Sequence, residues 1–382
     1  MKILRVAASM DPAFGGPPYG IRASIRAMAE MGVENAVVCC DAPDAKWIGR
    51  DAFPLHALGP GRFGFSYTPK LGPWLRENAG RFDAVVVHGM WQWPGLAVLR
   101  VRVPRFFLMP HGMLDPWFQR ARSRRVKAVR NFFYWWLAER WVVNRAAGLF
   151  FTCEEEMRLA ATTFDGYRPK RALNIGYGIQ SPPAFSEKMQ KAFLEKVPRF
   201  EGQPYLLFLG RIHPKKGVDL LVSAYLQFLK TEKLKNDFPH LVIAGPGWDT
   251  GYGAEVKARI GENSMIHTIG LLEGDSKWGA LHGCEAFVLP SHQENFGIAV
   301  VEALGCNKPV LISDKVNIWR EIVADGAGLA EEDSIQGTAR LLQRFKKGEL
   351  NGANPQRFHD CFLGRFEIQH AARVFLKAVQ TL

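Results

Sequence analysis

The sequence predicts an α/β protein of two doubly wound domains, each with a parallel sheet between layers of helices. Three observations lead to this prediction. The chain has 382 residues, enough for two domains of ordinary size. Short apolar runs alternate with amphipathic segments, as expected for consecutive strand–helix units. The alternation stops once, near residues 176–202, and then begins again, which places a linker between the two predicted domains.

The alternation in the first half begins at the start of the chain. Residues 3–8 form an apolar run that we interpret as a strand rather than a signal peptide, because Arg5 interrupts it and a glycine-rich loop follows. The other elements expected in this half are a helix at 21–31, strands at 36–40, 84–88, 105–109 and 148–152, and a helix at 154–162.

The second half repeats the pattern after a stretch that contains Pro182, Pro183 and Pro198. We expect strands at 205–209, 241–244, 265–269, 286–289 and 310–312, a helix at 218–229, a helix that begins near Phe296, and helical structure over 355–382. The predicted organisation is therefore an N-terminal domain at 1–180, a linker at 181–202, a C-terminal domain at 203–360 and a terminal helix at 361–382.

Charge and cysteine content narrow the class of function. The formal net charge is +12, and it is concentrated in residues 1–180, where 25 Lys and Arg face 14 Asp and Glu, whereas residues 181–382 hold 24 against 23. A basic half favours a polyanionic partner, such as a membrane surface, a phosphorylated substrate or nucleic acid. No apolar run is long enough to predict a transmembrane helix. The six cysteines lack metal-binding spacing and are expected as buried thiols in a reducing cytoplasm.

Two glutamates follow the predicted strand at 286–289. Glu294 lies in the loop after this strand, and Glu302 lies in the apolar helix that comes next. Carboxylates at the end of a parallel strand can accept hydrogen bonds from sugar hydroxyls, and the start of the helix suits a diphosphate. The alternative is a salt-bridged pair on a surface helix. The helix around Glu302 is almost wholly apolar, so its carboxylate needs a partner or a ligand.

A second polar turn follows the predicted strand at 205–209. It carries Arg211 and Lys216, two cations that can hold a diphosphate and neutralise it as it leaves. Gly245 and Gly247 follow the next strand, where they either allow a ligand to approach the backbone or simply form a turn.

Together these elements resemble the E-x7-E signature and the G-R-x4-K-G element of retaining glycosyltransferases of family 4, which have the GT-B fold. The resemblance implies two Rossmann-like domains that face a central cleft, with a C-terminal helix that crosses back to the N-terminal domain. It implies that Glu294 contacts the donor sugar, Glu302 binds the ribose, and Arg211 and Lys216 bind the leaving diphosphate. It also implies donor contacts by Gly245, Gly247, Leu271, Asn295, Phe296 and Gly297.

The first half matches this family mainly at the ends of strands. The run 15–20 lacks the G-x-G-x-x-G spacing of a dinucleotide site, so we do not predict NAD binding. The resemblance implies that Gly16 faces the donor phosphate, although a plain turn remains open. It implies that His111, at the end of the predicted strand 105–109, contacts the donor sugar. His88 ends the preceding strand and is a candidate for the acceptor side.

Residues 120–130 hold six cations and no acid, followed directly by aromatic residues. Two interpretations stay open: an interfacial helix on anionic lipid, or a core helix packed through Phe132, Phe133 and Trp136 with solvated arginines. The cations of this membrane or acceptor patch are Arg120, Arg122, Arg124, Arg125, Lys127 and Arg130.

The function that the resemblance implies is transfer of a sugar, with retention, from a UDP- or GDP-sugar to a saccharide acceptor. We expect a lipid-linked acceptor in bacterial exopolysaccharide or O-antigen assembly, at the cytoplasmic face of the inner membrane, and neither a cofactor nor a metal. Two alternatives are a nucleotide-sugar epimerase of the same fold and a basic nucleic-acid-binding module. The second lacks any recognisable signature, so we expect no nucleic-acid partner.

Overall fold

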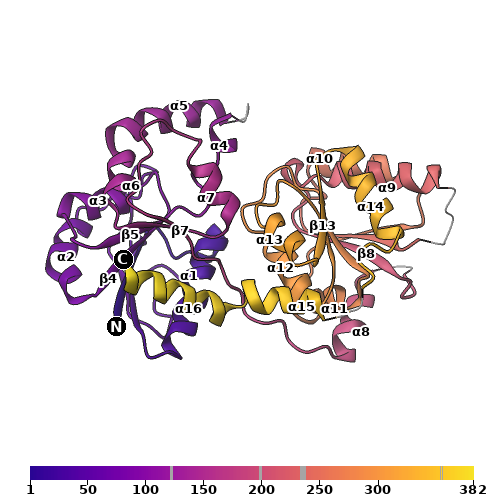
Figure 1. The fold of residues 1–382 in the computed structure, drawn as a ribbon, viewed down its shortest axis with the longest axis horizontal. Helices are drawn as coiled ribbons and strands as arrows, with labels where there is room; N and C mark the ends of the chain where they lie inside the picture. The colour runs from indigo at the N-terminus through magenta and orange to yellow at the C-terminus, as the bar shows by residue number, and fades with distance from the viewer. Residues whose placement is uncertain (121–123, 198–199, 233–237, 353, 355) are drawn as a thin grey trace. The chain divides into compact units, whose positions relative to one another are not determined.

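The computed structural model describes residues 1–120, 124–197, 200–232, 238–352, 354 and 356–382. It divides into two compact units (Figure 1): residues 1–180 together with 367–382, and residues 181–366. Each unit holds one parallel sheet with helices around it. The predicted fold class of two doubly wound α/β domains is therefore confirmed.

The first unit contains a seven-stranded sheet of order β3-β2-β1-β4-β5-β6-β7. Five of its strands lie within a residue or two of the predicted ranges. The two edge strands, β3 and β7, have three residues each, too few for a clear hydrophobic pattern. The strand bounds are β1 Lys2–Ala7, β2 Glu34–Cys39, β3 Leu55–Ala57, β4 Ala84–His88, β5 Phe106–Met109, β6 Gly148–Phe151 and β7 Ala172–Asn174.

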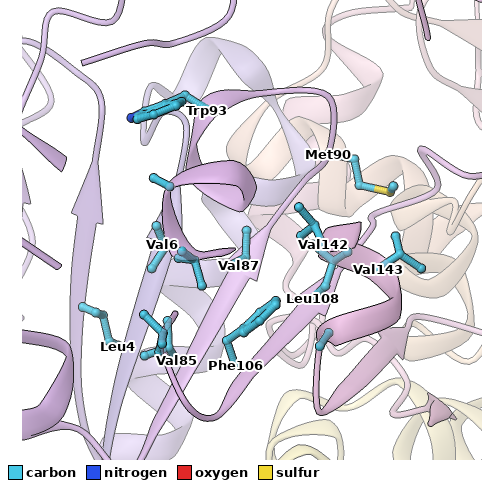
Figure 2. Packing of buried hydrophobic residues seen from close by; sticks show 14 of the residues in the cluster. Leu4, Val6, Val85, Val87, Met90, Trp93, Phe106, Leu108, Val142 and Val143 are labelled. Carbon is cyan, nitrogen blue, oxygen red and sulfur yellow. The ribbon is translucent and has the colours of Figure 1, made fainter. Parts of the chain in front are cut away.

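Side chains that alternate along these strands enter two different cores. Leu4 and Val85 face a cluster that includes α2 (Leu71–Asn78), α3 (Trp93–Val101) and α6 (Arg140–Arg145). Ile3 and Val86 face a cluster that includes α1 (Gly16–Ala29) and α16 (Ile368–Thr381). Both faces of the sheet are therefore buried, which explains the nearly continuous apolar strands. Figure 2 shows Leu108 of β5 beside Val142 and Val143 of α6 in the first cluster.

The helices of the first unit connect consecutive strands. Helix α1 begins at Gly16, five residues earlier than predicted, because Pro17 and Pro18 are tolerated in a first helical turn. The bounds are α1 Gly16–Ala29, α2 Leu71–Asn78, α3 Trp93–Val101, α4 Trp117–Arg120, α5 Arg125–Tyr134, a π-helical turn Trp135–Glu139, α6 Arg140–Arg145 and α7 Glu154–Ala160.

The second unit contains a six-stranded sheet of order β10-β9-β8-β11-β12-β13. Its strands are β8 Tyr205–Leu209, β9 His240–Ala244, β10 Ile266–Ile269, β11 Ala286–Leu289, β12 Val310–Ser313 and β13 Gly328–Glu331. Its helices are α8 Glu187–Leu194, α9 Val218–Thr231, α10 Gly251–Ile260, α11 Gly274–Gly283, α12 Ile298–Gly305, α13 Trp319–Ala324, α14 Ile335–Lys346 and α15 Arg357–Cys361. Helix α8 lies inside the expected linker range and packs on α11.

The terminal helix α16, Ile368–Thr381, belongs to the first unit, where it packs against α1. Phe375 of this helix is buried, its ring lies 5.4 Å from that of Phe150, and the Arg5 guanidinium lies 4.2 Å above it. The chain thus returns to the unit in which it began.

The structure defines the start of one predicted helix and decides between two interpretations of another. Helix α12 begins at Ile298, two residues after Phe296, because Gly297 has a φ of 78° and ends the preceding loop in the left-handed region. Phe132, Phe133 and Trp136 do not pack into a core, since each is exposed, and Trp135 is the buried aromatic residue instead. Among the described helices, none combines the length and the apolar character needed to cross a bilayer.

Candidate functional site

The turn after β8 lies against the loop after β11 in the second unit. Gly217 has a φ of 66°, and a Cβ there would lie only 2.1 Å from the Pro290 carbonyl oxygen. The backbone N–H of His292 and the Ser291 hydroxyl both donate to the Lys215 carbonyl oxygen, each at 2.8 Å. These contacts join the two polar segments that the sequence singled out, and only glycine permits the approach.

The first consequence is an ion pair between Lys216 and Glu294, which lie 78 residues apart. Both side chains are largely buried, with 18% and 17% of their surface exposed. The backbone of Glu294 is held as well: its N–H donates to Lys315, and its carbonyl accepts from the Asn317 N–H, each at 2.9 Å. A fixed loop with a largely buried charge pair can exchange its internal contact for a charged, hydroxyl-bearing ligand.

Glu302 lies in the second turn of α12 and has an ionic partner that the sequence analysis did not identify. The Lys277 ammonium, from α11, donates to Glu302 Oε1 at 2.7 Å. The signal for such a partner was present, because a carboxylate on an apolar helix requires one. The pair leaves Glu302 13% exposed at the surface of the unit.

The glycines after β9 are explained by contacts within the protein. A Cβ on Gly245 would lie 1.8 Å from the Gly210 carbonyl oxygen, and one on Gly247 would lie 2.7 Å from that of Ile212. The Ile212 N–H donates to Pro246 at 2.8 Å. These glycines therefore seat the segment that carries Arg211, whose side chain is exposed.

The four remaining residues predicted to contact the donor lie in different environments. Asn295 accepts a hydrogen bond of 3.4 Å from the Asn317 amide, and Phe296 is buried against Phe366. Gly297 caps α12, while Leu271 is exposed in the loop after β10. The Phe296 side chain therefore stabilises the unit, so a ligand would meet the backbone at this position.

In the first unit, His111 and His88 form a pair at the ends of β5 and β4. His88 Nδ1 lies 2.9 Å from His111 Nε2, and the rings are stacked. Burial, aided by the Arg5 charge, lowers the pKa of His111 to about 4, and burial lowers the pKa of His88 as well. Both imidazoles are thus neutral at pH 7, and each offers one donor and one acceptor nitrogen in total.

A buried glutamate holds the loop that carries His111. Glu156 accepts hydrogen bonds from the backbone N–H groups of Gly112, at 2.5 Å, and Thr152, at 2.8 Å. This role of Glu156 was not predicted from the sequence, because three consecutive glutamates at the start of α7 resemble ordinary acids of a first helical turn.

Gly16 is the first residue of α1, and its carbonyl oxygen accepts a hydrogen bond of 3.0 Å from the Tyr177 hydroxyl. The next two residues, Pro17 and Pro18, have no backbone N–H. The start of this helix therefore offers fewer donors to an anion than most helices do.

The basic patch divides into two groups. Arg120, Arg125 and Lys127 are exposed, and Arg122 lies outside the described residues. Arg124 is only half-exposed, with its guanidinium 4.7 Å above the Phe118 ring, and Arg130, although exposed, donates to Asn131 Oδ1 at 3.1 Å. The second group, Arg124 and Arg130, lines a cavity of about 470 Å³ that also reaches His88 and His111.

Two curated proteins named as sugar transferases resemble parts of this sequence. D-inositol 3-phosphate glycosyltransferase from Geodermatophilus obscurus is 26% identical over 59% of this chain and 51% of its own length. O-antigen chain mannosyltransferase B from Escherichia coli is 27% identical over 38% of this chain and 37% of its own. The chain thus spans about half, or less, of the curated relatives that it matches.

Similarity to solved structures extends over the whole chain. The structure of HepE from Anabaena in complex with UDP and glucose has a TM-score of 0.71 and 15% identity, and it covers all of both chains. This similarity establishes the GT-B fold.

Two family models match this sequence, one for each half. The glycosyl transferase 4-like domain matches residues 15–178, and the model for glycosyl transferases of group 1 matches residues 189–360. The segments that they cover contain the predicted residues of both halves, from Gly16 to Glu302. The chain belongs to the group 1 glycosyl transferases.

Proposed function

We propose that this protein is a retaining glycosyltransferase that moves a sugar from a nucleotide-sugar to a saccharide acceptor. The observation that carries the proposal is the ion pair between Lys216 and Glu294, close to the start of the helix with Glu302. Support also comes from relatives named as glycosyltransferases and from the UDP and glucose bound by HepE.

The proposed roles follow from charge and chemistry. Lys216 and Arg211 bind the donor diphosphate and stabilise its charge as the glycosidic bond breaks. When Lys216 pairs with the diphosphate instead of with Glu294, the Glu294 carboxylate becomes able to accept hydrogen bonds from the donor sugar. His111, as a neutral imidazole, contacts the same sugar. Glu302 accepts from the ribose hydroxyls. Gly16, the glycines after β9, Leu271 and residues 295–297 complete the proposed donor contacts through the backbone.

We propose that no metal or cofactor takes part, since the two cations Arg211 and Lys216 supply the positive charge that a metal ion would otherwise provide at the diphosphate. Activity is then expected to survive a chelator such as EDTA. A loss that added Mg²⁺ or Mn²⁺ restores would contradict this part of the proposal.

We further propose a lipid-linked acceptor, at the cytoplasmic face of the bacterial inner membrane, in exopolysaccharide or O-antigen synthesis. The support is a surface on α5 and the π-helical turn, hereafter the α5 face, that consists of Val126, Val129, Phe133 and Leu137. These four residues are 58–86% exposed and follow one another at intervals of three and four, so they share one side of a helix. Arg125 and Lys127 flank them, as on helices that bind anionic bilayers.

The test of the donor site is thermal unfolding with UDP, GDP, ADP and their sugars. A ligand that binds the folded protein raises its midpoint by mass action, so one nucleotide series should stand out. Lys216→Ala should abolish the shift, whereas Lys215→Ala, its neighbour in the same turn, should retain most of it. Equal shifts in all three proteins would contradict the role of Lys216.

The products then decide the reaction. Transfer with retention predicts that the new glycosidic bond has the anomeric configuration of the donor, which proton NMR measures. Turnover of the donor to an isomeric nucleotide-sugar with no acceptor present would instead identify an epimerase.

A further inference from the structure

We infer that the 470 Å³ cavity of the first unit binds a phosphate-bearing acceptor, and that Arg124 and Arg130 grip its phosphate or diphosphate. The inference rests on the proposed function, because it names the class of acceptor for that reaction. Its evidence lies wholly in the first unit, and among the residues proposed to contact the donor only His111 lines the cavity.

The cavity lies at the carboxyl ends of three neighbouring strands. Ser9 follows β1, His88 ends β4, and His111 follows β5, and all three line it. This edge is where parallel sheets bind ligands, and the volume is in the range of small-molecule sites. Arg124, Arg130 and Asn131 close the cavity from the side of α5.

The charges around this cavity favour an anion. Among the described residues that line it, none is acidic, and two are arginines. The two histidines are held neutral by burial, which lowers the pKa of each. An anionic group can therefore enter without meeting a carboxylate, and a guanidinium binds phosphate oxygens through paired hydrogen bonds.

The two arginines are oriented by their neighbours and still have donors to offer. Arg124 Nε is buried and has no hydrogen-bond partner in the described part of the chain. Its guanidinium carbon lies 4.7 Å above the centre of the Phe118 ring, a cation–π contact that restrains the side chain. Arg130 is held by the buried Asn131 through both Nε and one terminal nitrogen. A buried donor without a partner is costly, and a phosphate oxygen would remove that cost.

The rest of the cavity suits the remainder of a phosphorylated sugar or polyol. Trp91, Phe14 and Met113 offer apolar and aromatic surface. At the strand ends, His88 Nε2 is buried without a partner among the described residues, so it can exchange a hydrogen bond with a hydroxyl. The site therefore combines a phosphate grip on the α5 side with hydroxyl-binding groups at the sheet.

The cavity assigns different tasks to cations of one helix. Arg125, which directly follows Arg124 in sequence, is exposed and is absent from the described lining. It provides a matched control: the same side chain, one residue away, on the outside of the unit.

The test measures binding of four probes by calorimetry in the presence of saturating UDP. D-inositol 3-phosphate and farnesyl diphosphate represent a soluble and a lipid source of phosphate, and inositol and farnesol are their phosphate-free counterparts. At least one phosphate probe should bind, and its counterpart should bind at least tenfold more weakly. Arg124→Gln and Arg130→Gln should each weaken the affinity for that probe tenfold or more, whereas Arg125→Gln should weaken it less than twofold. Arg124→Lys should weaken the affinity less than Arg124→Gln does.

The inference is overturned if the wild-type protein binds neither of the two phosphate probes. It is also overturned if Arg124→Gln and Arg125→Gln lose affinity for a phosphate probe equally. Thermal unfolding of each variant identifies any that fails to fold. In that case the affinities of Arg124→Lys and Arg130→Lys for the phosphate probe decide the test. UDP binding should be unchanged in the arginine variants. If UDP fails to bind but the phosphate probes still depend on Arg124, the proposed donor site is wrong and the cavity assignment stands.

Discussion

Individual carboxylates in this protein differ because of what surrounds them. Glu294 and Glu302 have lysine partners, and Glu156 is held by backbone N–H groups. Glu139, in the π-helical turn, is 1% exposed; its Oε2 accepts a hydrogen bond of 3.2 Å from the Trp91 N–H, whereas its Oε1 has no partner within the described residues. A lysine-paired carboxylate that is partly exposed is available to a ligand, whereas a buried carboxylate without a cationic partner resists ionisation.

Glu302→Gln should weaken the affinity for the nucleotide by about 1–3 kcal/mol, because a charged acceptor of ribose hydrogen bonds is lost. Lys277→Gln is the control, since it removes the partner and leaves the carboxylate. It should have a smaller effect, and titration calorimetry measures both. A larger loss in Lys277→Gln would show that Glu302 serves mainly to hold Lys277.

Glu139 should make the stability of the first unit depend on pH. Burial raises its pKa to about 8, whereas the unfolded chain titrates near about 4.3. The folded state holds the proton more tightly, so this stabilisation is complete at acid pH and is lost as the pH rises through the folded pKa of about 8.

The measurement is urea unfolding between about pH 6.5 and 8.5 of the wild-type protein and Glu139→Gln, because groups that titrate in both proteins cancel in the difference between their stabilities. The wild-type protein should lose stability between about pH 6.5 and 8.5, and Glu139→Gln should lose less, since each unit of pKa shift is worth about 1.4 kcal/mol. Parallel curves for the two proteins would refute the assignment.

Among the elements, α5 has side chains in two different environments, a cavity and the solvent. Arg124, just before it, and Arg130 line the cavity, whereas the four side chains of the α5 face are exposed. Figure 1 shows α5 at the periphery of the first unit. The exposed position of Phe132, Phe133 and Trp136 removes the core interpretation of this helix. An apolar helix face left in water favours a surface that can cover it.

Vesicle sedimentation should therefore detect binding of the protein to membranes through the α5 face. Wild-type protein should sediment with anionic vesicles at low salt, and Phe133→Ser with Leu137→Ser should abolish this. Arg125→Gln with Lys127→Gln should weaken it by about 1 kcal/mol per cation, in a salt-dependent way. Phe63→Ser, at an 86% exposed site of the same unit, is the matched control. Failure of the wild-type protein to bind at low salt rejects the membrane proposal.

For the whole molecule, the main feature is that the chain completes its first unit with its last helix. Helix α16 covers one face of the seven-stranded sheet through Phe375, Val379 and their neighbours. The first unit is therefore built from two segments that are far apart in sequence, whereas residues 181–366 form a unit from one continuous segment.

Phe375→Ala should destabilise the first unit by about 3–5 kcal/mol, since it removes a buried ring and leaves a cavity. Arg5 also loses the ring beneath its guanidinium. In urea, the transition of the first unit should move to lower concentration, while the transition that UDP shifts should not change. Gln380→Ala, at an exposed position of the same helix, should change neither. Equal shifts of both transitions would mean that the units unfold together.

The sequence by itself determined the fold class, most strands of the two sheets and the family, because apolar periodicity and strand-end motifs are local properties of the chain. It also indicated that Glu302 needed a partner. Only the tertiary structure decided that this partner is Lys277, that Lys216 meets Glu294, that Gly245 and Gly247 serve backbone packing, and that the basic patch divides between a cavity and an outer face. These are contacts between distant segments, and residue spacing along one segment carries no information about which other segment folds against it.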